Sequence, residues 1–347
     1  MSRETLDWLS QNTLIGFTEK RGNAWHHRAG DDNHYPGPIP VDLVEKRLFN
    51  WEAEERPLYV GSHPHIPGTV QIGRHAEVPG SKAIVRSDTG NVLGIFKDGY
   101  QPHQYRQWLL GNVARILDDD LQIGSAGLLR GGAVAWVSVE VPDTIETVAG
   151  IRFRPFLMAT TSFDGSLATT YKRGATNVVC DNTMTAFLRE EGETFRVKHS
   201  AKSLGRLTDA RDALGIVYAI AEDFEAEVKR LLDVKVDDAT WGRIVDDLMP
   251  LPDRSDYKDN RGYAAAETRA VKKRSSVQRL YKWDDRVAPW AGTGFGAWQA
   301  FNTWGQHEKE VRGATRQERN MLRAATGDIE KEDTNAVDRI LRVALAA

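Results

Sequence analysis

Hydrophobic and polar positions alternate over much of the chain between about residues 61 and 205. In 133–141, AVAWVSVEV, every odd position is alanine or valine, whereas the even positions mix apolar and polar residues. Such alternation is typical of a strand with one better-buried face. RFRPFLMATT (152–161) and SLATTYK predict two more strands, and GTVQIGR, AIVRSD and NVLGIFKD predict shorter ones between turns. A helix is expected over 103–117, within an otherwise β-rich region.

From about residue 204 the apolar positions recur at helical spacing. Pro250-Leu251-Pro252 and the Ala-Gly-Thr-Gly run at 291–294 interrupt the pattern. Near the start, Pro40 followed by VDLVEKRLF predicts a helix over 41–49 in an otherwise irregular segment. We expect three parts: an N-terminal segment over 1–60, an α+β domain over 61–205 and a helical region over 206–347. The predicted C-terminal helices are 204–232, 236–248, 260–284, 296–309, 315–325 and 333–346.

The stretch 160–187 suggests the arrangement of the sheet. Its strand pattern breaks at Asp164-Gly165, resumes as SLATTYK, and ends at Lys172-Arg173 before Gly174. Asp181 or Asn182 then opens a helical pattern over 182–190. Strands over 121–141, 151–161 and 166–172 followed by this helix predict a β-β-β-α core. The predicted fold class is α+β, with a mixed or antiparallel sheet followed by a mainly helical region.

Composition narrows the classes of function. The 347 residues carry a net charge of −3, so any nucleic-acid surface must be a local basic patch. Cys180 is the single cysteine, which excludes an intramolecular disulfide and a cysteine zinc cage and fits a reducing compartment. Neither a secretory signal nor a long apolar run is visible. We therefore expect a cytoplasmic protein that does not enter a membrane.

Several blocks of the sequence resemble a known family. They are LIGFTEKRGNAWHHR, KDGYQPHQY, AGLLRGGAVAWVSVEV, TTSFDGSLATTYKRGATNVVCDNTM, KHSAKS, AWQAFNTWGQHE and RGATRQERNMLRAATG. In these blocks, which span most of the chain, the sequence is similar to phage- and plasmid-like proteins that carry domain of unknown function 932. The resemblance implies an origin in mobile elements, often among recombination and replication functions. The β-β-β-α order is also similar to that of single-strand annealing recombinases, which is an analogy at the level of fold.

The strongest nucleic-acid feature is a basic amphipathic helix over 261–286. It holds eight basic and three acidic residues, with most of the cations on one side and apolar residues on the other. A row of cations releases counterions when it binds phosphates. A solvated charged face is the equally weighted alternative. The residues expected to contact nucleic acid here are Arg269, Lys272, Lys273, Arg279 and Lys282.

A second basic cluster surrounds the predicted β-β-β-α unit. Arg152 and Arg154 alternate along one strand face, and Tyr171 or Phe163 is available for stacking bases. Scattered surface charge is again the alternative. The expected contacts from this cluster are Arg152, Arg154, Lys172, Arg173, Lys198 and Lys202.

Other chemistry finds little support in the sequence. A nucleophilic Cys180 with His199 as its base is conceivable, but VVC reads better as a buried strand end. His63 and His65 are separated by a proline and lack a carboxylate cluster, so no metal site is expected. Phosphate-binding glycine loops are absent. We therefore predict no catalytic residue, no cofactor and no metal, and leave enzymatic activity open, with a non-enzyme favoured.

These observations lead to one principal hypothesis. The chain is expected to be a mobile-element DNA-binding protein that binds or anneals single-stranded DNA in recombination, and to work as a homo-oligomer. The alternative is a structural or protein-interaction protein of a phage or plasmid, with its ten tryptophans serving packing or a partner surface. An exposed patch of Trp290, Trp298 and Trp304 would favour this alternative. The two hypotheses differ in whether the basic clusters line a groove or are consumed by salt bridges.

Overall fold

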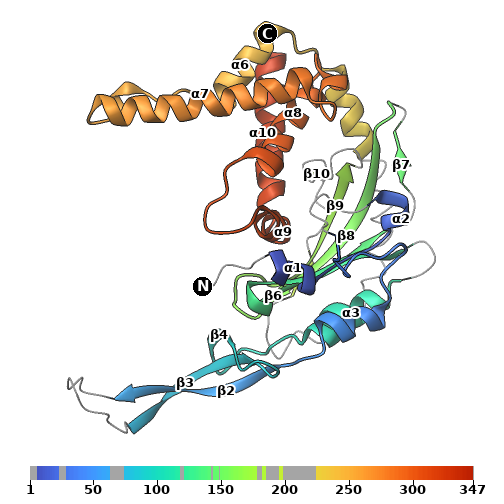
Figure 1. The fold of residues 1–347 in the computed structure, drawn as a ribbon, viewed down its shortest axis with the longest axis vertical. Helices are drawn as coiled ribbons and strands as arrows, with labels where there is room; N and C mark the ends of the chain where they lie inside the picture. The colour runs from blue at the N-terminus through green and yellow to red at the C-terminus, as the bar shows by residue number, and fades with distance from the viewer. Residues whose placement is uncertain are drawn as a thin grey trace. The chain divides into compact units, whose positions relative to one another are not determined.

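The computed structural model describes residues 6–22, 29–62, 74–117, 121–141, 144–147, 149–177, 182–184, 195–197 and 224–346 (Figure 1). The chain forms two compact units, each assembled from distant segments. The sheet unit contains Met1–Pro142, Leu157–Lys172 and Glu193–Leu214; the helical unit contains Asp143–Phe156, Arg173–Gly192 and Gly215–Ala347. These units do not test the three contiguous parts expected over 1–60, 61–205 and 206–347, which stay a prediction.

An eight-stranded sheet has the order β1-β5-β6-β8-β9-β10, with β7 beside β8 and β11 beside β9. Pairing is antiparallel between β1 and β5, β5 and β6, β7 and β8, and between β9 and each of β10 and β11. Together with the helical C-terminal region, this confirms the predicted α+β class. The strands are β1 (Thr13–Ile15), β5 (Gln122–Leu129), β6 (Val134–Glu140), β7 (Ile145–Glu146), β8 (Arg152–Ser162), β9 (Thr169–Asn177), β10 (Asn182–Met184) and β11 (Phe195–Val197).

Three details of the predicted sheet are wrong. The single strand counted over 121–141 is two antiparallel strands, although the hairpin turn that the sequence predicts at Arg130–Gly132 is observed, with positive φ at both glycines. The helix expected from 182 starts instead as β10, because Asn182–Met184 pair with Asn177 to Ala175 of β9. Lys172 and Arg173 do not end a strand, since β9 continues through Gly174 to Asn177. Residues 185–190 lie outside the described residues.

Strand β6 is buried on both faces, contrary to the expected single buried face. All seven of its residues are buried. Helices α1 (Leu6–Asn12) and α3 (Val41–Leu48) contact the neighbouring β5, and the π-helix η1 (Tyr105–Leu110), which continues as α4 (Gly111–Ala114), contacts β6. Trp136 also lies opposite Gly127 of β5, and its ring fills the space that a Cβ there would occupy. When other elements cover both faces of a strand, residues at odd and even positions are all buried, so the strand loses the alternation of buried and exposed residues that its sequence period predicts.

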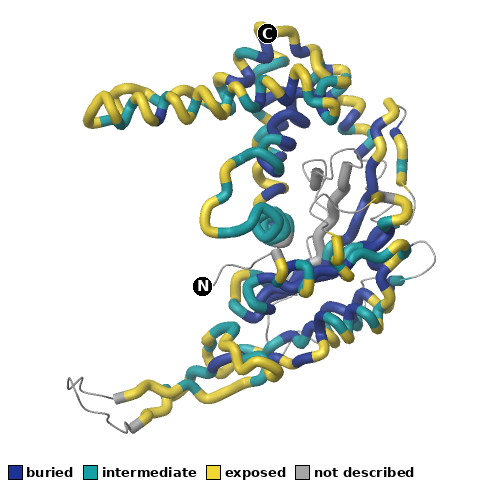
Figure 2. The backbone as a smooth tube through the Cα atoms, viewed as in Figure 1, coloured by how far each residue is buried: buried dark blue, intermediate teal, exposed yellow. Residues whose placement is uncertain are grey.

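A second, three-stranded sheet has the order β2-β3-β4. Figure 2 shows that much of this ribbon is exposed, and four large apolar side chains on it are more than half exposed: Tyr59, Val60, Val92 and Ile95. Its strands are β2 (Ala53–Ser62), β3 (Arg74–Arg86) and β4 (Val92–Lys97). The short helix α2 (Thr18–Arg21) and the 3-10 turn η2 (Arg130–Gly132) complete the regular elements of the sheet unit.

The described helices of the helical unit agree with the predicted ones to within about two residues at their ends, except that the last helix begins at Asp328 instead of 333. Residues 204–223 of the first predicted helix lie outside the described residues. After a helix over 224–233, its elements are α6 (Asp238–Leu248), η4 (Arg254–Asp256), α7 (Asn260–Trp283), η5 (Ala288–Trp290), α8 (Gly294–Thr303), the π-helix η6 (Trp304–Glu308), α9 (Arg316–Thr326) and α10 (Asp328–Leu345). Their core includes the start of β8, where Phe153 packs on Phe224 at 4.0 Å between ring centroids. Trp241 of α6 stacks on Tyr281 of α7 at 3.8 Å.

Helix α7 has two halves with different surroundings. Its C-terminal half buries Val277, Leu280 and Tyr281 in the core, whereas Ala266 is the one buried residue of the N-terminal half. Figures 1 and 2 show this half extending from the other helices of its unit as an exposed arm. Asp259 caps the arm by accepting a hydrogen bond from the Gly262 amide at 2.6 Å. The arm therefore presents side chains to solvent on a helix that is anchored at its far end.

Candidate nucleic-acid interface

A groove of about 460 Å³ lies along the arm of α7. Three separate parts of the chain line it: the segment after α6, the arm itself, and η6 with the residue that follows it. We call it the α7 groove. Its lining residues are Leu248, Met249, Pro250, Pro252, Tyr257, Ala266, Arg269, Ala270, Lys273, Trp304 and Lys309. The groove combines an apolar wall with three cations and two aromatic rings.

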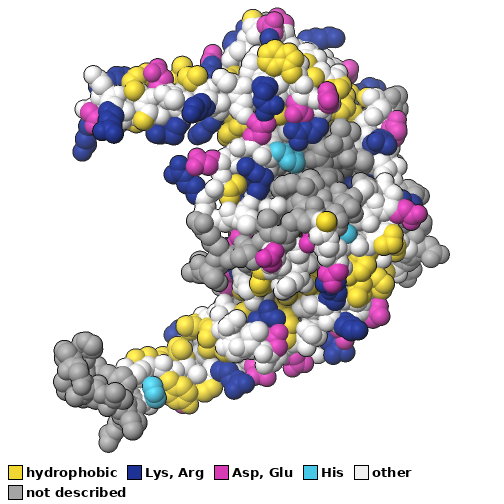
Figure 3. Space-filling model, viewed as in Figure 1, with side chains coloured by type: hydrophobic (Ala, Val, Ile, Leu, Met, Phe, Trp, Pro, Cys, Tyr) yellow, Lys and Arg dark blue, Asp and Glu magenta, His cyan; other side chains and the backbone are white. Residues whose placement is uncertain are grey.

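Helical spacing brings two of the cations together. Arg269 and Lys273 are four residues apart on α7, so they share one side of the helix. Both are exposed, and neither makes an ion pair with a described residue of the chain. Figure 3 shows Lys and Arg side chains gathered along this arm. Both side chains are therefore available to an anionic ligand.

The cations of the groove act electrostatically on Glu310, in the loop that follows η6. The pKa of Glu310 is lowered, first by its ion pair with Arg312 and further by the nearby positive charges of Lys273 and Arg269. Glu310 and Arg312 are 3.0 Å apart, and both side chains are largely exposed. Lys273 and Arg269 therefore contribute, after Arg312, to stabilising the charged form of the Glu310 carboxylate.

Trp304 supplies an aromatic wall to the groove. The ammonium of Lys309 lies 5.8 Å from the centre of the Trp304 ring, within the range of a cation–π contact. Lys309 also lies 3.5 Å from a carboxylate oxygen of Glu332. An indole beside cations is the combination that stacking platforms for single-stranded nucleic acids use.

Side chains of α9 hold the π-helix that carries Trp304. Arg319 donates to the Gly305 carbonyl at 2.5 Å, Arg316 donates to the Lys309 carbonyl at 3.0 Å, and Asn320 donates to the Gln306 carbonyl at 2.9 Å. These donors satisfy carbonyls that a helix end leaves without partners. Burial lowers the pKa of Arg319, and the neighbouring Arg323 and Arg316 lower it further. Arg316, Arg319 and Asn320 therefore hold η6 and the residue that follows it in place.

The basic helix predicted from the sequence divides into two groups. Arg269 and Lys273 line the α7 groove, and Lys272 is exposed on the same arm but does not line it. Arg279 pairs with Glu308, and Lys282 lies 3.4 Å from Asp238. Ion pairs therefore engage Arg279 and Lys282 in the C-terminal half of α7, whereas Arg269 and Lys273 line the groove. That the two basic clusters share one continuous groove stays a prediction.

The second predicted cluster is only partly exposed. Arg152 is exposed at the start of β8, but Arg154 is buried to 4% exposure, so the expectation that it lines a surface is wrong. Phe163 is also buried, against Tyr105 at 4.2 Å, and is not available for base stacking. Of Lys172 and Arg173 only the backbone, in β9, is described. Lys198 and Lys202 lie outside the described residues, as do Cys180 and His199.

The tryptophan surface of the alternative hypothesis is not formed as expected. Trp298 is completely buried in α8, and Trp290 and Trp304 are half-buried. The tryptophan with the largest exposure among the described large hydrophobic residues is Trp283, at 71%. Trp283 is the last residue of α7, and the pattern that predicted a basic amphipathic helix there gave no sign of an exposed tryptophan.

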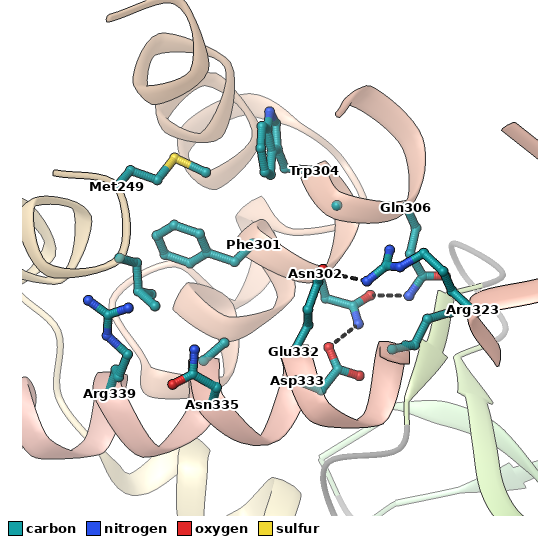
Figure 4. A pocket seen from close by; sticks show the side chains of 14 residues that line it. Met249, Phe301, Asn302, Trp304, Gln306, Arg323, Glu332, Asp333, Asn335 and Arg339 are labelled. Atoms are coloured by element: carbon teal, nitrogen blue, oxygen red, sulfur yellow. Dashed lines mark hydrogen bonds and ion pairs between the residues drawn. The ribbon is translucent and has the colours of Figure 1, made fainter. Parts of the chain in front are cut away.

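A second cavity of about 160 Å³ adjoins the α7 groove, with which it shares Leu248, Met249 and Trp304 (Figure 4). Its polar side includes a buried chain of hydrogen bonds. Gln306 donates to Asn302 Oδ1 at 3.0 Å, and Asn302 Nδ2 donates to Asp333 Oδ1 at 2.8 Å. The signal for this chain of hydrogen bonds in the sequence is the helical spacing of Asn302 and Gln306 in AWQAFNTWGQHE, four residues apart, which places both on one side of the helix.

Two further properties concern the described part of the chain alone. Within it, no three His, Cys, Asp or Glu side chains gather in a way that could hold a metal ion. His63 and His65 lie outside it. No helix in the same residues combines the length and apolarity that a membrane crossing requires.

Comparison with known proteins gives a family without a described activity. No curated protein and no solved structure matches the chain. The sequence model of one family, described as a domain of unknown function (DUF932), matches residues 92–326. The match covers more than half of the chain, from β4 to the end of α9, and includes the arm of α7 and Trp304. The chain therefore belongs to the DUF932 family.

Proposed function

We propose that this protein binds single-stranded DNA through the α7 groove. The observation that carries the proposal is the juxtaposition of Arg269 and Lys273, which make no ion pair with described residues, with the indole of Trp304. Cations provide phosphate contacts that do not depend on sequence, and an aromatic face accepts any base. An annealing role in phage-type recombination, performed by a homo-oligomer, is the biological setting that we propose for this binding.

The geometry favours a single strand over a duplex. Unstacked bases are needed to reach an aromatic side chain, and a duplex keeps its bases paired and stacked. Trp304 forms part of the groove wall beside Lys309. A strand whose phosphates follow Arg269 and Lys273 would therefore bring a base to the indole, whereas a duplex would be limited to the cations.

The test is fluorescence anisotropy of a labelled thymidine oligonucleotide of about 16 nucleotides, with unlabelled duplex as competitor. We expect binding that weakens as salt increases and that duplex of equal length displaces poorly. Trp304→Phe keeps an aromatic face and should retain binding, whereas Trp304→Leu should weaken it. An absence of binding at low salt, or equal competition by duplex, would contradict the proposal.

A second candidate function is supported by the β2-β3-β4 sheet. Tyr59 and Val60 of β2 and Val92 and Ile95 of β4, the two strands that flank β3, are between 53% and 61% exposed. Exposed apolar side chains that gather on one element mark interaction surfaces. A protein-interaction role would use this sheet. Light scattering after size-exclusion chromatography tests it: Tyr59→Ser with Val60→Ser should reduce the mass of any assembly, and an unchanged mass would exclude these residues from its interface.

A further inference from the structure

The cavity beside the α7 groove has the construction of a small-molecule pocket. Figure 4 shows Met249, Phe301 and Trp304 toward one side and Asn302, Gln306 and Asp333 toward the other. An apolar wall facing a few placed polar groups is the usual composition of such pockets. At about 160 Å³ the space is close to that of a cavity of about 150 Å³ that binds benzene, so it suits one planar ring system.

The rim of the cavity pairs a donor with an acceptor. Arg323 lies 2.6 Å from a carboxylate oxygen of Glu332, and both residues line the cavity. Arg323 is mostly buried, with 14% of its side chain exposed, whereas Glu332 is 53% exposed. The two Glu332 oxygens face Arg323 and, at 3.5 Å, Lys309. A base at this edge would therefore share the carboxylate with Arg323 and displace the longer contact of Lys309, and it would find guanidinium N–H donors beside carboxylate acceptors.

Among the nucleobases, guanine has the complementary edge. Its O6 and N7 accept hydrogen bonds and match an arginine, and its adjacent N1–H and N2–H₂ groups donate and match a carboxylate. Thymine has one N–H between two carbonyls, so it would place a carbonyl against Glu332. Adenine lacks the O6 acceptor for Arg323, and cytosine lacks two adjacent donors for Glu332.

We propose that this cavity receives a single guanine base from the DNA strand held in the α7 groove. The inference rests on the proposed function, because the groove delivers the strand. Three shared lining residues, Leu248, Met249 and Trp304, make the two spaces continuous neighbours. Lys309 spans them, lying over the Trp304 ring and beside Glu332. A base that leaves the groove past Trp304 therefore meets the Arg323–Glu332 edge.

The experiment compares four labelled strands by fluorescence anisotropy. One is a thymidine tract of about 16 nucleotides, and the others carry a single central dG, dA or dC. We expect the strand with dG to bind about tenfold more tightly than the plain tract, the discrimination expected of a well-placed bidentate contact to a base. The strands with dA and dC should bind within about twofold of the tract.

Two variants of α10 supply the matched comparison. Glu332→Gln removes the bidentate acceptor and should abolish the preference for dG while retaining binding to the plain tract. Glu330→Gln removes the same charge from an exposed position on the same helix that does not line the cavity. It should keep the preference.

The results distinguish a failure of the guanine pocket from a failure of DNA binding through the α7 groove. Equal binding of all four strands, preference for another base, or equal behaviour of the two variants would overturn the guanine pocket while leaving DNA binding intact. Arg269→Ala with Lys273→Ala should weaken every strand alike and keep the preference. An absence of binding to all four strands would overturn the proposed function and the guanine pocket together.

Discussion

Removing the two cations of the arm should change the salt dependence of DNA binding by a calculable amount. For single strands, the logarithm of the binding constant falls with the logarithm of the salt concentration with a slope of about −0.7 per neutralised phosphate. Three cations line the α7 groove: Arg269, Lys273 and Lys309. If each contacts one phosphate, with Lys309 giving up its 3.5 Å contact with Glu332, their combined slope is about −2. Arg269→Ala with Lys273→Ala should reduce the magnitude of the measured slope by about 1.4.

Expressed as affinity, the difference is easily measured. Between about 50 and 200 mM salt, a slope near −2 weakens binding about twentyfold, and a slope near −0.7 weakens it about threefold. The assay is anisotropy of a labelled thymidine oligonucleotide at several salt concentrations. Because both side chains are exposed, the free energy of unfolding of the double variant should lie within about 0.5 kcal/mol of the parent's, and a urea titration measures it.

The control must remove equal charge from the same helix. Arg261→Ala with Lys272→Ala does so, since both residues are exposed on α7 and neither lines the groove. This pair should change the slope by less than half as much. If the two double variants shift the slope equally, the arm acts as a diffuse positive charge, and the α7 groove is not the binding site.

Three further predictions concern stability. Asn302→Ala should lower the free energy of unfolding by about 2–3 kcal/mol, measured in urea, because buried Asp333 loses a hydrogen-bond donor. The control, Asn335→Ala, changes an exposed residue of the same cavity and should alter stability by less than about 0.5 kcal/mol, so equal effects would contradict the buried network. Gly242→Ala should stabilise α6 by about 0.5–1 kcal/mol, since nothing lies within 4 Å of the added Cβ, and a lower urea midpoint would refute this. Burial alone would raise the pKa of Asp164, but hydrogen bonds from Ser166 and Arg130 outweigh it and the pKa is lowered. The ionised Asp164 carboxylate therefore stabilises the fold above its ordinary pKa of 3.8, and this contribution is lost as pH falls through the lowered pKa of the folded state. Asp164→Asn should lower the melting temperature at pH 7 and have a smaller effect near pH 2, and an effect independent of pH would refute this.

The helices were predictable because local signals delimit them. The expected helices over 236–248 and 260–284 are observed as Asp238–Leu248 and Asn260–Trp283. Asp237 and Asp259 cap them, and the prolines at 250 and 252 separate them. Capping residues and prolines act on their own neighbours in sequence, so periodicity and breakers together determine where such helices begin and end.

The errors occur where distant parts of the chain decide the structure. Asn182–Met184 is a strand because β9 pairs with it, which overrides the local preference for a helix start. Arg154 alternates with apolar neighbours like a surface residue, yet the structure around β8 buries it. Trp304 and Lys309 join the groove only because η6 folds back beside α7. Spacing within one helix could not indicate any of these contacts.

Because ion-pair partners come from other elements, counting the charges of the basic helix overestimates the number of its cations that can bind DNA. Eight basic residues over 261–286 would predict a salt slope of about −5.6 if each met a phosphate. The structure assigns four of them to acidic partners: Arg274 to Asp246, Arg279 to Glu308, Lys282 to Asp238 and Arg286 to Asp284. Two of these partners lie on α6 and one on η6, so no pattern within α7 reveals them. The paired cations hold the C-terminal half of α7 to its unit, and the arm keeps the cations that a ligand can reach. A measured slope near −2 would therefore support the groove, and a slope near −5.6 would mean that DNA binding breaks the ion pairs that anchor the helix.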